Sequence, residues 1–112
     1  MITYNYINVI KDDFKLILTL DRPEKRNAFT PTMVNEIQDA FNEANMDEEV
    51  KLVIIKANGP IFCAGMDLKT FENPALDNFN AAIIPQDISL GVVFDKLHKP
   101  SIALVEGNVR AG

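Results

Sequence analysis

The sequence contains one cysteine and no long apolar run. Its single cysteine, Cys63, cannot form an intramolecular disulfide, which favours a reducing compartment. No apolar run is long enough to span a bilayer. The first residues carry neither the basic segment nor the apolar segment of a signal peptide. The sequence therefore predicts a cytoplasmic protein without a membrane partner.

Positive charge is also scarce. The 112 residues include 11 Lys and Arg against 16 Asp and Glu, a formal net charge of -5. This acidic balance argues against nucleic acid as the main partner. It does not exclude an anionic ligand, because a few local lysines and arginines can hold phosphates. The length and the 47% apolar content are those of a single globular domain with a modest core.

The N-terminal pattern predicts a β-hairpin. Two β-rich runs, 4–10 and 14–20, flank a polar turn at 11–13. In the second run, every second residue is a leucine from Leu16 to Leu20. This alternation is typical of a strand that is buried on one face.

A helix is predicted from Thr30. Thr30 can cap the helix, and Pro31 suits its first turn. One apolar stripe follows at helical spacing, made of Met33, Val34, Ile37, Ala40, Phe41 and Ala44. The polar residues that fill the opposite face are Asn35, Gln38, Asp39, Asn42 and Glu43.

The remaining pattern alternates strands with helices. Residues 52–57 are nearly continuously apolar, which predicts a strand buried on both faces. A short helix is predicted from Asp67 and a longer one over 86–97, separated by an irregular stretch at 72–85. Another apolar strand is predicted over 101–105. Alternating strands and helices favour an α/β fold with parallel pairing.

Two loops are unusual for simple connections. Residues 59–69 and 107–112 each follow a predicted buried strand and contain small residues, where a backbone can approach a ligand closely. Ligands of α/β proteins bind beyond the carboxyl ends of parallel strands. Backbone N–H groups in such turns can bind a negatively charged oxygen.

Three segments carry a specific resemblance. Residues 62–68 resemble the A-G-x-D-L signature of the crotonase (enoyl-CoA hydratase/isomerase) superfamily. Residues 20–28 resemble its R-P-x-x-x-N-A segment, and 99–107 resemble its K-P-x-I-A-x-V-x-G strand. They occur in the family's order and at about its spacing. The resemblance implies a crotonase-like ββα-repeat α/β fold, of which residues 1–112 form an N-terminal part, because the family's domain is about twice this length.

The resemblance also implies a site. In the family, two backbone N–H groups form an oxyanion hole for the thioester carbonyl of an acyl-CoA, and the matching positions are Met66 and Gly112. Such donors favour the enolate as charge grows on the oxygen. The implied substrate-binding or CoA-binding residues are Ala64, Gly65, Asp67, Lys69, Lys25 and Arg26. Coenzyme A enters as part of the substrate, and neither another tightly bound cofactor nor a metal is expected.

Two functions remain open from the sequence. The first is an acyl-CoA enzyme: a hydratase, isomerase, hydrolase or decarboxylase that assembles as a trimer or hexamer like full-length family members. The second is a truncated, non-catalytic fragment that only binds CoA or assembles with other chains. The family's acid/base residues lie beyond its second oxyanion segment, so none is assigned here. The segment 110–112 reads Arg-Ala-Gly, where the family has three glycines.

Several of these residues have structural alternatives. Asp67 suits the cap of the short helix that follows it. Cys63 is expected to be a small buried apolar residue and not a nucleophile. The charged loop residues Arg22, Lys25 and Arg26 fit a solvated loop as well as they fit contacts with CoA.

Overall fold

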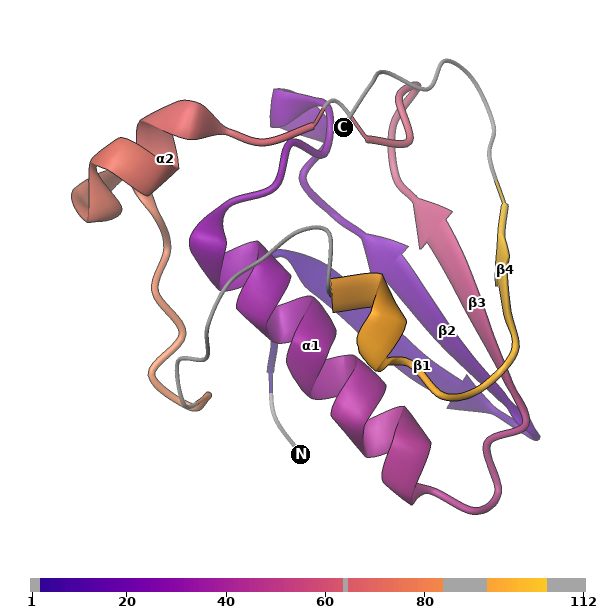
Figure 1. Ribbon diagram of the computed structural model, residues 1–112. Coiled ribbons are helices and arrows are strands. Elements are labelled where there is room, and N and C mark those ends of the chain that lie inside the picture. The colour runs from indigo at the N-terminus through magenta and orange to yellow at the C-terminus, as the bar shows by residue number, and fades with distance from the viewer. Residues whose placement is uncertain (1–2, 64, 84–92, 105–112) are drawn as a thin grey trace.

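The computed structural model describes residues 3–63, 65–83 and 93–104, which form a sheet with one long helix across one face (Figure 1). The four strands lie in the order β1-β2-β3-β4. Strand β1 is antiparallel to β2, whereas β2, β3 and β4 are parallel to one another. The main elements are β1 (Ile7–Asp12), β2 (Lys15–Leu20), α1 (Pro31–Met46), β3 (Leu52–Ala57) and β4 (Ser101–Ala103). The predicted α/β class with parallel pairing is confirmed.

The predicted hairpin is present, but its first strand begins later than expected. Strand β1 begins at Ile7 because the residues before it bond to another element. The backbone N–H groups of Asn5 and Tyr6 both donate to the carboxylate of Glu36 in α1, at 2.6 and 2.8 Å. The turn lies at Asp13, whose φ of 56° is in the left-handed region.

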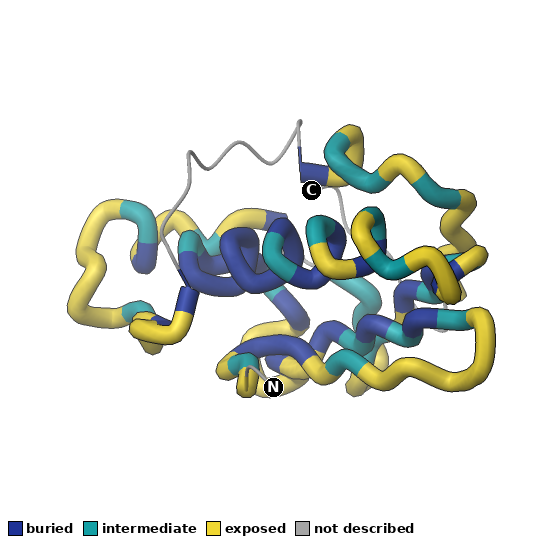
Figure 2. Tube along the Cα trace, turned by 90° about the horizontal axis from the view of Figure 1, so that it is seen from below, coloured by how far each residue is buried: buried dark blue, intermediate teal, exposed yellow. Residues whose placement is uncertain are grey.

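The core lies between α1 and the sheet (Figure 2). The alternation in β2 is confirmed, because its three leucines are buried. In β3, Val53 and Ile55 are buried, but Leu52 and Ile54 are only half-buried and Lys56 is exposed. The prediction that this strand is buried on both faces is therefore wrong for the part of the chain that the structure describes, where α1 covers one face.

The start of α1 agrees with the sequence pattern. The hydroxyl of Thr30 accepts a hydrogen bond of 3.0 Å from the backbone N–H of Met33, which caps the helix. A second acceptor comes from far along the chain, since the carboxylate of Asp77 accepts from the N–H of Thr32 at 2.9 Å. Two of the first free N–H groups of the helix are thus satisfied by side-chain oxygens.

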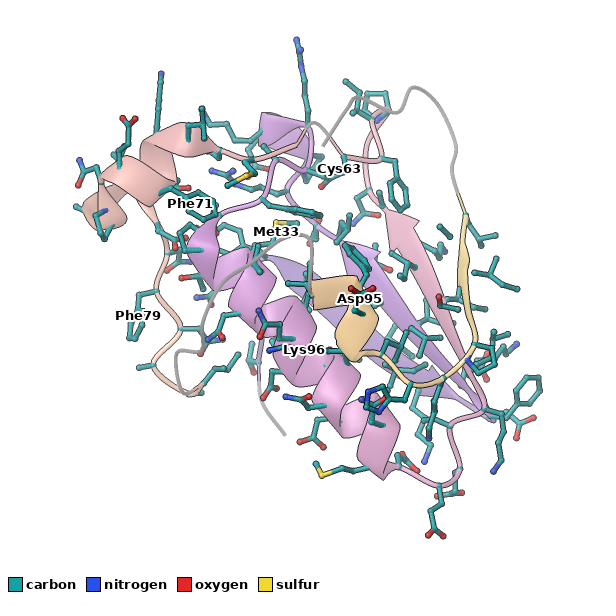
Figure 3. All side chains as sticks on the ribbon, viewed as in Figure 1. Met33, Cys63, Phe71, Phe79, Asp95 and Lys96 are labelled. Atoms are coloured by element: carbon teal, nitrogen blue, oxygen red, sulfur yellow. The ribbon has the colours of Figure 1, made fainter. Side chains whose placement is uncertain are left out.

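The opposite face of α1 is less exposed than predicted. Asn35 and Gln38 are 7% and 0% exposed, and Glu36 beside them is also completely buried. Segments outside the sheet enclose this face: Lys96, labelled in Figure 3, donates to the side chain of Gln38 at 3.0 Å. The helical pattern identified the apolar stripe correctly, but burial of the polar side depends on these additional segments.

The remaining elements are short. They are helix α2 (Leu68–Glu72) and the 3-10 turns η1 (Pro23–Lys25), η2 (Pro74–Leu76) and η3 (Phe94–Lys96). The short helix predicted after Asp67 is confirmed. Of the helix predicted over 86–97, only η3 and its flanks fall in the described residues. None of the helices in the described residues has the length and apolar character needed to cross a membrane.

Strand β4 differs from expectation in its burial. Its three residues are exposed, and it forms the edge of the four-stranded sheet, so the prediction of a buried strand is wrong for these residues. Residue 105, the expected end of this strand, lies outside the described residues. On the face away from α1, the pairing places four isoleucines in one row across the sheet: Ile10, Ile17, Ile54 and Ile102. This row forms an apolar stripe on that face.

Candidate functional site

The candidate site lies where β2 and β3 end. Parallel strands bring their carboxyl ends to the same edge of a sheet, and here the loops 21–29 and 58–67 meet at that edge (Figure 1). The N–H of Asn58 continues the pairing by donating to the carbonyl of Leu20 at 2.9 Å. The two segments that resemble family motifs are therefore packed against each other.

Asn27 joins the two loops. Its side-chain Nδ2 donates to the carbonyls of Asn58 and Ile61, both at 2.8 Å, and its Oδ1 accepts from the N–H of Arg22 at 2.8 Å. Asn27 is completely buried and has a φ of 56°. Asparagine suits this position because its amide supplies an acceptor and two donors, and because asparagine tolerates the left-handed region.

The same loops also make a steric contact. Gly59 has a φ of +87°, and a Cβ placed on it would lie 2.9 Å from the Cβ of Pro23. A glycine here allows the turn after β3 to approach the charged loop closely.

Met66 lies opposite Phe29 in a single parallel bridge. The N–H of Phe29 donates to the carbonyl of Gly65 at 2.7 Å, and the N–H of Asp67 donates to the carbonyl of Phe29 at 2.8 Å. The Gly65–Met66 peptide bond is trans, so its N–H points opposite to its C=O. The Met66 N–H is therefore directed away from Phe29, and none of the described residues accepts a hydrogen bond from it.

A buried ion pair lies beside this bridge. Nη1 of Arg22 is 2.9 Å from Oδ2 of Asp67, and their side chains are only 8% and 17% exposed. Burial alone raises the pKa of Asp67, but the hydrogen bond and charge of Arg22 outweigh this effect and lower it. Asp67 occupies the N-cap position of α2, as predicted. Its side chain makes no capping hydrogen bond of ordinary geometry, but the backbone N–H groups of Thr70 and Lys69 also help to lower its pKa. Arg22 is not part of a solvated loop.

An open pocket of about 560 Å³ borders the bridge. Its lining residues are Arg22, Lys25, Ala28, Met66, Asp67, Leu68, Lys69, Thr70 and Leu76. Two of the three cationic residues expected near the CoA phosphates, Lys25 and Lys69, thus line the same pocket. Arg26 is exposed but does not line it, and Ala64 and Gly112 lie outside the described residues.

An apolar pocket of about 300 Å³ lies between the start of α1 and the segment 70–80. Phe71 and Phe79, both labelled in Figure 3, line it together with Pro31 and Pro74. It shares Thr70 with the lysine-lined pocket. The two pockets therefore adjoin at α2.

The one cysteine, Cys63, lies close to the bridge but does not have the environment of a nucleophile. Burial raises the pKa of the Cys63 thiol, and this effect outweighs the hydrogen bond of 3.4 Å that its Sγ accepts from the N–H of Gly65. The protonated thiol is a poor nucleophile. The side chain is half-buried, whereas the sequence predicted a buried one. Within the described residues, no group of three His, Cys, Asp or Glu side chains is placed to hold a metal ion.

Sequence reasoning missed two residues that support the site. Tyr6 places its ring 5.5 Å from the guanidinium of Arg22, and its hydroxyl donates to Asp77 at 2.8 Å. Glu36 accepts from the backbone N–H groups of the two residues that precede β1, as described above. Its complete burial sets Glu36 apart from the other carboxylates of α1. A single sequence does not reveal that burial.

These features define a class of protein: an α/β protein that presents a backbone N–H and local lysines at the carboxyl edge of a parallel sheet. The family model described as Enoyl-CoA hydratase/isomerase matches residues 15–111, and the chain belongs to this family. The family predicted from the sequence motifs is confirmed.

Individual relatives agree with this assignment. Enoyl-CoA hydratase EchA19 of Mycobacterium tuberculosis is 36% identical over 99 residues, which cover 87% of this chain and 37% of that protein. A crystal structure of an enoyl-CoA hydratase from Mycobacterium tuberculosis matches with a TM-score of 0.72 and 30% identity, over 91% of this chain and 38% of that one. A crystal structure of an enoyl-CoA hydratase/isomerase from Mycobacterium paratuberculosis matches with a TM-score of 0.66 and 29% identity. The match covers 90% of this chain and 37% of that one. The chain thus spans well under half the length of these relatives.

Proposed function

We propose that this chain is the N-terminal, thioester-binding part of an enzyme of the enoyl-CoA hydratase/isomerase type. In this proposal, the Met66 N–H donates to the carbonyl oxygen of an acyl-CoA, with Gly112 as the second donor. Negative charge builds on that oxygen as the thioester enolate forms, so fixed donors stabilise the enolate more than the ground state. One such donor is typically worth about 3 to 4 kcal/mol.

The observation that carries the proposal is the direction of the Met66 N–H. It points away from Phe29 and has no acceptor among the described residues, at the wall of the pocket that Lys25 and Lys69 line. A thioester oxygen would complete its hydrogen bonding. The two lysines, together with the exposed Arg26, would attract the CoA phosphates.

The remaining parts of the proposal concern the whole protein. Gly65 and Asp67 flank the donor peptide, and Ala64 would contact the adenine. Coenzyme A is the acyl carrier of the substrate, and no further cofactor is invoked. We place the protein in the cytoplasm. We also expect it to form a trimer or hexamer, and sedimentation at several concentrations would test this oligomeric state.

One observation favours a second candidate, a chain that binds CoA without catalysis. Among the described residues that line the pocket, Asp67 is the only one with a carboxylate. Its lowered pKa keeps it ionised near neutral pH, and its oxygen is committed to Arg22. Hydration of a double bond also needs general acid–base catalysis, which typically contributes about a hundred- to ten-thousandfold. Under this candidate, the chain binds butyryl-CoA but does not hydrate crotonyl-CoA.

The test measures butyryl-CoA binding by calorimetry for two variants at one position. Met66→Pro removes the N–H donor, whereas Met66→Ala keeps the donor and removes only the side chain. We expect Met66→Pro to weaken binding by about tenfold or more and Met66→Ala to have a much smaller effect. Equal binding by the wild type and a folded Met66→Pro variant would refute the proposed donor. Turnover of crotonyl-CoA, followed by the loss of enoyl-thioester absorbance, then separates the two candidates.

A further inference from the structure

One nitrogen of Arg22 spans the bridge between the two loops. Nη1 donates to the carbonyl of Ala28 at 2.9 Å and to Oδ2 of Asp67 at 2.9 Å. Ala28 immediately precedes Phe29, and Asp67 immediately follows Met66. The guanidinium therefore connects the residue before one bridge partner to the residue after the other.

This connection bears directly on the orientation of the Met66 N–H. The carbonyl of the Gly65–Met66 peptide accepts a hydrogen bond from the N–H of Phe29, and the next peptide is held by the N–H of Asp67, which donates to the carbonyl of Phe29. The bridge is isolated, so among the residues that the structure describes no further ladder hydrogen bonds keep the peptide plane from rotating. The ion pair of Asp67 with Arg22 supplies a third fixed point beside these two.

Arg22 is itself held before any ligand arrives. Its backbone N–H donates to Oδ1 of Asn27 at 2.8 Å, and its guanidinium lies 5.5 Å from the ring of Tyr6. The Tyr6 hydroxyl donates to Asp77 and accepts from the N–H of Asn78 at 2.6 Å. A buried side chain with partners on each side loses little further freedom when a ligand binds.

We infer that Arg22 is a positioning residue for the Met66 N–H: by joining Ala28 to Asp67 it fixes the direction of the donor peptide. This inference rests on the proposed function, because it assumes that the N–H binds a thioester oxygen. Arg22 acts here through Asp67 and does not itself contact the carbonyl. Its loss should therefore weaken the part of binding that depends on the carbonyl oxygen and spare the part that depends on CoA.

A pair of ligands isolates that part. Butyryl-CoA has the thioester carbonyl, whereas S-butyl-CoA replaces it with a methylene group and keeps the rest of the molecule. The ratio of their dissociation constants, measured by calorimetry on the full chain, reports the interaction with the carbonyl oxygen. For the wild type, we expect butyryl-CoA to bind about tenfold more tightly, the typical effect of one good hydrogen bond.

Three variants test the role of Arg22. Arg22→Met keeps a long apolar side chain but removes the N–H donors. For this variant, the ratio of the two dissociation constants should fall close to one, while the affinity for S-butyl-CoA changes little. Arg22→Lys retains a cation that can pair with Asp67, so it should recover part of the ratio. Lys11→Met is the control, because Lys11 also pairs with two carboxylates, Asp47 at 2.9 Å and Glu49 at 3.1 Å, away from the pocket; its ratio should equal that of the wild type.

The outcomes separate the two levels of the proposal. A wild-type ratio of one, or no binding of either ligand, would overturn the proposed function and the inference with it. A wild-type preference that persists in folded Arg22→Met would overturn the inference alone. So would an equal loss of both ligands, which indicates a direct contact of Arg22 with CoA. If Arg22→Met does not fold, Arg22→Lys decides: a ratio below the wild type supports the positioning role, and an unchanged ratio contradicts it.

Discussion

The carboxylate of Glu36, completely buried in α1, accepts a hydrogen bond of 2.8 Å from the side-chain amide of Asn80. The same carboxylate binds the backbone N–H groups that precede β1, so it joins the helix, the sheet and the segment after α2. Burial raises the pKa of Glu36, and this effect outweighs the hydrogen bonds from Asn5, Asn80 and Tyr6, which favour the charged form; the nearby charge of Asp77 raises it further.

This pKa shift predicts a pH dependence of stability. The folded state binds the Glu36 proton more tightly than the unfolded state, whose pKa is about 4.3. The stabilisation is therefore complete below that pH and is lost as pH rises through the folded-state pKa. Glu36→Gln cannot titrate, so the unfolding free energy of the wild type should fall relative to this variant across that window. Denaturant unfolding at a series of pH values measures the difference.

A suitable control is Glu24→Gln, which removes an exposed carboxylate on η1. It provides the baseline for losing one negative charge from an acidic protein. If the unfolding free energy of the wild type instead rises relative to that of Glu36→Gln as pH increases, the folded state favours ionised Glu36, contrary to this prediction.

The helix cap predicts a difference between two substitutions at Thr30. Thr30→Val keeps the shape of the buried side chain but leaves the N–H of Met33 without its acceptor, which should cost about 1 to 2 kcal/mol. Thr30→Ser keeps the acceptor and loses only a methyl group, so it should cost less. Urea denaturation gives both values, and a Thr30→Val variant as stable as Thr30→Ser would argue against the cap.

The contact between Gly59 and Pro23 predicts a coupled effect. Gly59→Ala should destabilise the fold by about 1 to 2 kcal/mol from the left-handed backbone alone. The contact with the Pro23 Cβ at 2.9 Å should add to this cost. In a Pro23→Gly background that contact is absent, so the same substitution should cost less. Equal costs in the two backgrounds, measured by thermal unfolding, would show that the backbone absorbs the contact.

Asn27 predicts a large penalty for an isosteric change. Asn27→Asp replaces the amide that donates to Asn58 and Ile61 with a second oxygen, which faces two carbonyls in a buried position. An unpaired buried charge of this kind should cost about 3 kcal/mol or more. The exposed residue Asn8 supplies the matched control, because Asn8→Asp makes the same change at the surface and should shift the urea midpoint only slightly. Similar midpoints for both variants would contradict the role assigned to Asn27.

Local chemistry allowed much of the fold to be predicted. The bounds of β3 match the apolar run at 52–57, because such a run is bounded by polar and turn residues. The start of α1 follows from Thr30 and Pro31, whose preferences act within a few residues. The hairpin boundaries were less accurate, since bonds from Glu36 to the residues before Ile7 end the ladder there.

The motif at 62–68 identified Met66 as a candidate donor from the sequence alone, since a short motif fixes residue types and the small residues around them. The direction of its N–H was settled only in three dimensions, where Phe29 meets Gly65. The pairing of Arg22 with Asp67 joins residues 45 positions apart. Local propensity carries no information about such a contact, because it forms only when parallel strands bring two loops to the same edge of the sheet. The same is true of Glu36, whose burial depends on segments that close over the polar side of α1.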